Sequence, residues 1–147
     1  MKKIPWDKYE TALLIESYIE IVDKKKKRAD VVRDLSATLR KRAINLGLDI
    51  DDIFRNQNGI SFRLEEIKYL FLDGQKGLSH TSKMFRDTVE LYRNSQDDFD
   101  RLLVYAKAIL VYPEGYKKEY QKMVSLLSNN PEGNEFAVED FLLRVFS

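Results

Sequence analysis

The stretch DIDDIFRNQNGISFRLEEIKYLF, residues 49–71, decides the fold of the first half of this chain. Apolar residues recur every three or four positions from Ile60 to Phe71, which is the spacing of one face of an α-helix. The polar run Asn56–Gly59 interrupts this pattern. Asn58 is a favourable N-cap residue and Gly59 permits a tight turn, so we expect the helix to begin close to Ile60.

The same spacing predicts two helices before this stretch. The first covers residues 6–22 and the second about 29–46, with a lysine-rich connector between them. Gly47 is placed to end the second helix in a left-handed conformation, as glycine often does. Asp49 is then expected to cap a short turn from which Ile53 and Phe54 point inward.

Helical spacing also dominates the second half of the chain. A fourth helix is expected over about 81–94, and Ser95–Asp98 has the form of a capping box that opens a fifth. Pro113 stops that helix, and two further helices are expected over about 114–127 and 135–146. The apolar ending FLLRVFS favours a chain cut from a longer protein.

The predicted fold is therefore all-α. We expect a tri-helical, helix-turn-helix-like unit in residues 1–73 and three to four further helices in residues 74–147. The two parts are expected to pack together as one compact domain, because a chain of 147 residues suits a single core.

Composition excludes several classes of protein. The chain has no cysteine, and no uncharged apolar run approaches the roughly 20 residues that a membrane span requires. The first residues lack the apolar stretch of a secretory signal. We therefore expect a cytoplasmic protein that does not bind a membrane.

Enzymatic chemistry finds little support in the residue inventory. His80 is the only histidine, which excludes Cys/His metal clusters, and the chain lacks the glycine-rich phosphate-binding motifs. Asp49, Asp51 and Asp52 leave a divalent-metal site open as an alternative, although helix capping and helix-dipole interactions also explain these carboxylates. We expect a non-enzymatic protein without a metal or cofactor.

The charge distribution suggests a polyanionic partner. The net charge of the chain is only +1, but residues 24–42 form a basic region. This region contains nine Lys or Arg residues and two Asp residues, which gives a local charge of +7. Residues 51–100 carry a local charge of −3. Such a stripe is typical of proteins that contact phosphate, and a solvated helix face is the alternative reading.

Tri-helical units commonly place their third helix in the major groove of DNA. Asn and Gln can pair with adenine, Arg can bind guanine or phosphate, and the helix start near Gly59 can hold an anion. The candidate contacts near the bases are Arg55, Asn56, Asn58, Ser61, Arg63 and Lys68. The candidate contacts to the backbone are Lys24, Lys25, Lys26, Lys27, Arg28, Arg40, Lys41 and Arg42.

Two features of the same stretch favour a purely structural role. Arg55 has Asp51 and Asp52 close by in sequence as possible ion-pair partners. Glu65 and Glu66 lie in the proposed reading helix, where they would repel phosphate.

The segments IPWDKYETALLIESYIEI and LSATLRKRAINLGLDIDDIFRNQNGISFRLEEIKYLF resemble a module found in bacterial proteins. The chain is similar, over about residues 4–105, to the region that precedes the catalytic domain in HNH-type restriction endonucleases and in helicase-like bacterial proteins. More loosely, the tryptophan near the start and the Gly-Ile opening of the third helix are similar to Myb/SANT-like helix-turn-helix domains. The resemblance implies a DNA-associated module of a bacterial DNA-processing or defence protein.

Two functional hypotheses follow. The first is a non-enzymatic module that binds duplex DNA with a steep salt dependence. The second is a protein-interaction or oligomerisation domain, because aromatic residues are dense in the later helices and the last segment is apolar. Its surface would lie in residues 114–147.

Overall fold

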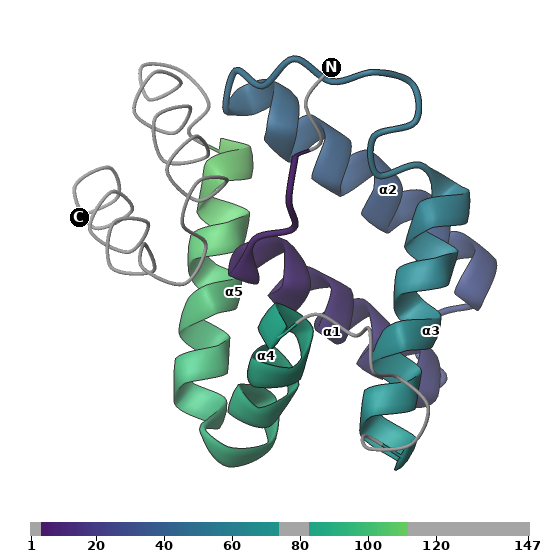
Figure 1. The fold of residues 1–147 in the computed structure, drawn as a ribbon, viewed down its shortest axis with the longest axis vertical. Helices are drawn as coiled ribbons and strands as arrows, with labels where there is room; N and C mark the ends of the chain where they lie inside the picture. Colours follow the sequence, from purple (N-terminus) through teal and green to yellow (C-terminus); the bar gives the residue numbers. More distant parts are fainter. Residues whose placement is uncertain (1–3, 74–82, 112–147) are drawn as a thin grey trace.

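The structure is a computed structural model, and it describes residues 4–73 and 83–111. These two ranges contain helices and no strand, so the all-α prediction is confirmed. The helices expected over 114–127 and 135–146, the stop at Pro113 and His80 lie outside the described residues. The helices run in the order α1 (Lys8–Val22), α2 (Arg28–Asn45), α3 (Gln57–Asp73), α4 (Lys83–Asn94) and α5 (Gln96–Val111) (Figure 1).

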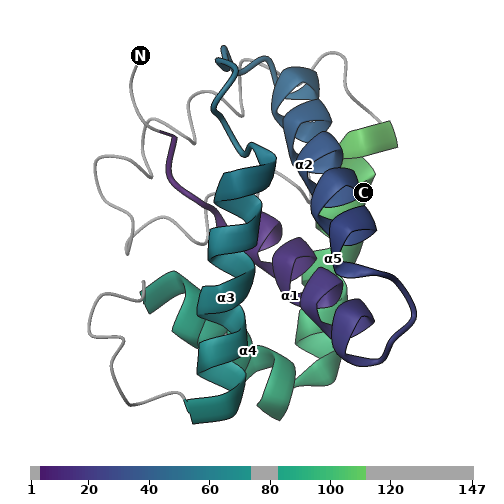
Figure 2. The same cartoon turned by 90° about the vertical axis from the view of Figure 1, so that its right-hand side faces the viewer.

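Helix α1 is the centre of the fold. It packs against each of the other four described helices, and Figures 1 and 2 show it crossing the middle of the molecule between α3 and α5. Its residues Tyr9, Leu14 and Ile15 have no exposed surface. Burying a large apolar side chain stabilises a fold by about 1.5–3 kcal/mol, so this helix contributes much of the core energy.

A chain of aromatic contacts joins α1 to α3, α4 and α5. Tyr18 stacks on Phe71 at 5.2 Å between ring centroids, Phe71 meets Tyr92 at 5.6 Å, and Tyr92 meets Phe99 at 5.0 Å. Offset and edge-to-face pairs of this kind add about 0.5–1.5 kcal/mol each beyond their buried area. Tyr92 and Phe99 therefore close the core, which is one of the two roles that their density in the sequence left open.

Helices α1 and α2 end with the same backbone arrangement, and Gly47 adopts the predicted left-handed conformation with φ of 80°. The amide of Leu48 then donates back into the last turn of α2 at 3.0 Å. At the end of α1 the amide of Lys25 donates to the carbonyl of Glu20, also at 3.0 Å, and Lys24 takes the position of the glycine with φ of 59°. Both ends are Schellman motifs.

The N-cap of α3 lies two residues before the predicted one. Asn56, not Asn58, is the N-cap, because the amide of Gly59 donates to Asn56 Oδ1 at 2.8 Å and the helix begins at Gln57. The connection from α2 spans residues 46–56, longer than the three or four residues typical of a helix-turn-helix. A wide connection leaves room for the turn described next.

The turn before α3 is capped by Asp51 and not by Asp49. The amides of Ile53 and Phe54 donate to Asp51 Oδ1 at 3.1 and 2.8 Å. The prediction that Ile53 points inward is wrong, since the residue is 70% exposed, whereas Phe54 is partly buried. The carboxylate of Asp51 therefore stabilises the turn.

Candidate nucleic-acid interface

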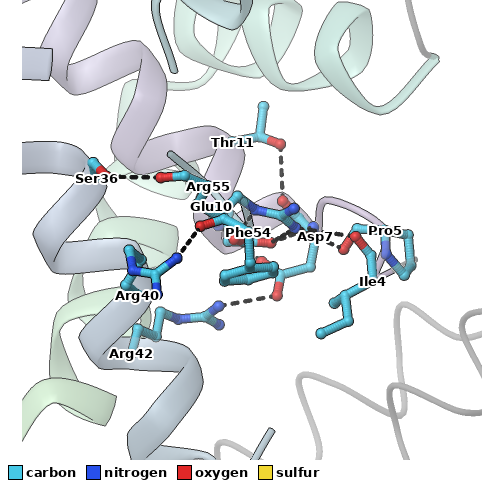
Figure 3. A network of polar contacts seen from close by, with 10 residues as sticks. All are labelled: Ile4, Pro5, Asp7, Glu10, Thr11, Ser36, Arg40, Arg42, Phe54 and Arg55. Carbon is cyan, nitrogen blue, oxygen red and sulfur yellow. Dashed lines mark hydrogen bonds and ion pairs between the residues drawn. The ribbon is translucent and has the colours of Figure 1, made fainter. Parts of the chain in front are cut away.

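The side chain of Arg55 points into the protein. Its Nε and Nη2 atoms donate to the two carboxylate oxygens of Glu10 at 2.8 and 2.9 Å, in the bidentate geometry that arginine favours (Figure 3). The two side chains are 8% and 5% exposed. The guanidinium also lies 4.6 Å from the centre of the Trp6 ring and 4.3 Å from that of Phe54. The predicted role of Arg55 in contacting DNA is corrected by this burial, and its partner is Glu10 instead of Asp51 or Asp52.

Arg55 also fixes the start of the described chain. Its Nη2 donates to the carbonyl oxygens of Ile4 and Pro5 at 3.3 and 3.2 Å. Its own carbonyl accepts a hydrogen bond of 2.7 Å from Ser36 Oγ on α2. The residue adopts a left-handed backbone with φ of 47°, an uncommon conformation for arginine. Three separate segments hold it in that conformation.

Arg42 is buried in the same way. Its Nη1 donates to Asp7 Oδ2 at 3.1 Å, and the side chains are 3% and 10% exposed. Asp7 and Glu10 form the capping box of α1, in which the Glu10 amide donates to Asp7 at 2.8 Å. One buried cluster therefore joins the start of α1 to α2 and to the turn before α3 (Figure 3). The predicted backbone contact from Arg42 is corrected, because its side chain does not reach the surface.

Arg40 binds the connection between α2 and α3. Its Nη1 donates to the carbonyl oxygens of Asp51 and Phe54 at 3.0 and 2.6 Å. These bonds tie the 49–56 turn to α2, so Arg40 is a structural residue of the connection. Lys41, its neighbour in sequence, is exposed.

The polar candidates on α3 have mixed surroundings. Arg63 is partly buried, pairs with Glu66 at 2.7 Å and lies 5.7 Å from the ring centre of Phe85. Ser61 is half-buried and its carbonyl accepts a bond of 3.2 Å from Arg28. Asn58 and Lys68 are exposed. Exposed side chains on the predicted reading helix also include apolar ones.

An apolar line runs along the outside of α3. Phe62, Tyr69 and Leu72 are 64%, 41% and 71% exposed. A helix that reads base edges presents polar or basic side chains along the face that enters the groove. Sequence inspection of the buried face alone missed this line, although its spacing of seven and three residues is visible in the sequence.

The connector between α1 and α2, Lys24–Lys27, is exposed along its whole length. Lys26 forms an ion pair of 2.9 Å with Glu20, and this hydrogen bond raises the pKa of Lys26. Within residues 4–73 and 83–111, Lys24, Lys25 and Lys27 take part in no ion pair. Unlike Arg42 and Arg55, these lysines keep the positions in which a polyanion can reach them.

An open groove of about 440 Å³ lies beside the connector. Lys25 and Lys26 border it, and its apolar lining includes Ile19, Phe99 and Leu103. Two ion pairs lie along it, Lys107 with Glu16 and Lys26 with Glu20, each at 2.9 Å.

The described residues hold no group of three or more His, Cys, Asp or Glu side chains able to bind a metal ion. Asp51 accepts two amide hydrogen bonds in its turn, which accounts for its carboxylate. In the same part of the chain, no helix is both long enough and apolar enough to cross a membrane.

Comparisons with protein-family models, with curated proteins and with solved structures find no match to this chain. The resemblance to the region before HNH nuclease domains and to Myb/SANT-like domains therefore stays a prediction.

Proposed function

We propose that this domain contacts the phosphate backbone of duplex DNA through the lysine connector, Lys24–Lys27. The observation that carries the proposal is the exposure of four consecutive lysines, three of which form no ion pair with the described residues. Lysines of this kind neutralise phosphate without reading sequence. The contact proposed is therefore independent of base sequence.

The backbone of Lys24 supports a role for its charge. Lys24 occupies the left-handed position of a Schellman motif, where the equivalent residue of α2 is Gly47. The left-handed conformation costs a residue with a Cβ roughly 1–2 kcal/mol, and glycine avoids this cost. Local strain in a folded protein is a reason to look for function at the residue that carries it. A lysine at this position supplies a cation to the connector at the expense of stability.

The proposal leaves out two of the predicted contacts because their side chains are buried. Arg42 and Arg55 neutralise the buried carboxylates of Asp7 and Glu10, so they lend nothing to a surface potential. Base reading at the start of α3 loses Arg55 for the same reason, whereas Asn58 and Lys68 on α3 itself remain exposed. What remains is the electrostatic part of the first hypothesis, which predicts binding to any duplex of sufficient length.

Fluorescence anisotropy with a labelled duplex, repeated over a range of salt concentrations, tests the proposal. Replacing Lys24, Lys25 and Lys27 with Gln should lower the slope of log K against log salt by up to about 2.7, since each phosphate contact contributes about 0.9. A matched variant with Lys83, Arg86 and Arg101 changed to Gln removes the same charge from exposed positions on α4 and α5.

The matched variant should keep at least half of the wild-type slope. If both triple variants lose the same affinity, net charge alone drives binding and the connector has no special part. If the wild-type chain binds no duplex at low salt, the proposal is wrong.

A further inference from the structure

The outer face of α3 forms a ridge with regular spacing. Asn58, Phe62, Glu65, Tyr69 and Leu72 follow each other at steps of four, three, four and three residues, so they lie along one line of the helix. The ridge from residue 62 to residue 72 is roughly 15 Å long at 1.5 Å per residue. Its three apolar members are all exposed, as described above. This is the spacing with which one helix packs lengthwise against another.

Positive charge borders this ridge. Arg28 reaches α3 from the start of α2 and contacts Glu65 at 3.1 Å and the carbonyl of Ser61 at 3.2 Å. Lys68, three residues after Glu65, is exposed and forms no ion pair with the described residues. Arg28 therefore offsets the one acidic residue of the ridge, and Lys68 leaves the border positively charged.

We propose that the ridge of α3 (Asn58, Phe62, Glu65, Tyr69 and Leu72) docks an amphipathic helix of a partner protein. The partner presents apolar side chains to Phe62, Tyr69 and Leu72 and acidic side chains to Arg28 and Lys68. This surface lies beyond the DNA contact of the lysine connector and does not depend on it. It gives the protein-interaction hypothesis a location on α3, whereas the location predicted in residues 114–147 lies outside the described residues.

The charge beside the ridge argues against a second copy of this chain as the occupant. Aromatic side chains bury about 150–250 Å² when fully covered, so the exposed parts of these three residues offer on the order of 300 Å². A stable complex needs about 800 Å² from each partner. The ridge alone falls well short of this area for any occupant, so charge has to contribute to binding. Two copies joined through the ridge would bring their basic borders together, and these would repel each other. An acidic partner gains the electrostatic attraction that the small area requires.

Nucleic acid is a poor occupant for the same ridge. The central side chains of the ridge are apolar or acidic, and Glu65 would face phosphate once Arg28 turned away from it. Apolar side chains placed against a phosphate backbone gain no contact that offsets the loss of hydration of the charges. The lysine connector and the ridge therefore suit two different partners.

A set of labelled synthetic helical peptides tests the proposal by fluorescence anisotropy. Each peptide has about five helical turns, or roughly 18 residues, with leucines at three- and four-residue spacing. One carries Glu beside the leucine stripe, a second carries Lys there, and a third has Ser in place of the leucines. Wild-type protein should bind the Glu peptide at least about tenfold more tightly than either of the others.

The variant Phe62→Ser, Tyr69→Ser, Leu72→Ser should weaken binding of the Glu peptide by at least about tenfold. The matched variant Ile44→Ser, Val104→Ser changes residues that are 56% and 63% exposed on other helices and should bind as the wild type does. Equal binding of the Glu and Lys peptides, or unchanged binding by the ridge variant, would overturn the proposal.

Two further measurements separate the other occupants of the ridge. In sedimentation equilibrium, a dimer that the ridge variant loses would show that a second copy is the occupant, against the proposal. In thermal unfolding, the ridge variant should melt at the wild-type temperature. A large fall in its melting temperature would show that another segment of the same chain covers the ridge, which also contradicts the proposal. Loss of duplex DNA binding in the ridge variant would show that nucleic acid occupies the ridge instead.

Discussion

Removal of either partner of the Arg55–Glu10 ion pair should destabilise the protein strongly. Both side chains are less than a tenth exposed and share two hydrogen bonds of 2.8 and 2.9 Å. In Arg55→Met the Glu10 carboxylate loses both guanidinium donors and keeps only the Asp7 amide, which donates to it at 3.2 Å. Breaking a buried pair in this way costs about 3–5 kcal/mol. The variant also loses the contacts of the guanidinium with the rings of Trp6 and Phe54, each worth about 0.5–2 kcal/mol. The expected loss is therefore at least about 3 kcal/mol of the free energy of unfolding.

The reasoning is tested by urea unfolding of four proteins followed by circular dichroism: the wild type, Arg55→Met, Glu10→Gln and the double variant. Each single variant leaves the remaining charge without its oppositely charged side chain. The loss of unfolding free energy in the double variant should therefore be smaller than the sum of the two single losses by about 1–3 kcal/mol. Trp6, the only tryptophan, reports locally through its fluorescence, since Arg55 lies against its ring.

A control variant carries the same chemical change on the surface. Arg33 pairs with Asp30 and Asp34, and its side chain is 61% exposed. Arg33→Met should therefore cost no more than about 0.5 kcal/mol. A loss below about 1 kcal/mol for Arg55→Met, or losses that simply add in the double variant, would refute the role assigned to the buried pair.

Three further predictions concern the helix ends. Lys24→Gly should raise the free energy of unfolding by about 0.5–1 kcal/mol. Glycine removes the strain of the left-handed backbone, and this gain exceeds the extra chain entropy that glycine loses on folding. The same variant should lower the salt slope of DNA binding by about 0.9. Gly47→Ala, at φ of 80°, should instead lower the free energy of unfolding by about 1 kcal/mol. If urea unfolding finds Lys24→Gly less stable than the wild type, the strain assigned to Lys24 is wrong. Asn56→Ala should cost about 1 kcal/mol and Asn58→Ala much less, since only Asn56 caps α3, and equal losses in thermal unfolding would show that the cap is misplaced.

The sequence by itself determined the helical class and the positions of most helices. Apolar spacing is a local property, because the side chains of one face lie three or four residues apart, and it located α1 to α5 within a few residues. Gly47 was predictable for the same reason, since its backbone requirement belongs to one residue. The cap of α3 was harder, because Asn56 and Asn58 have equal capping ability and both precede the helical pattern.

Only the tertiary structure decided which arginines are structural. Arg42 and Arg55 meet Asp7 and Glu10 across 35 and 45 residues of chain, and sequence distance carries no information on such a meeting. Once packing buries the capping box of α1, its two carboxylates need donors that water no longer supplies, and the two arginines provide them. The same side chain types on the surface would have been free to bind phosphate. Burial, which depends on the whole fold, separated Arg42 and Arg55 from the lysines of the connector, whose chain position at an exposed helix end keeps them in water.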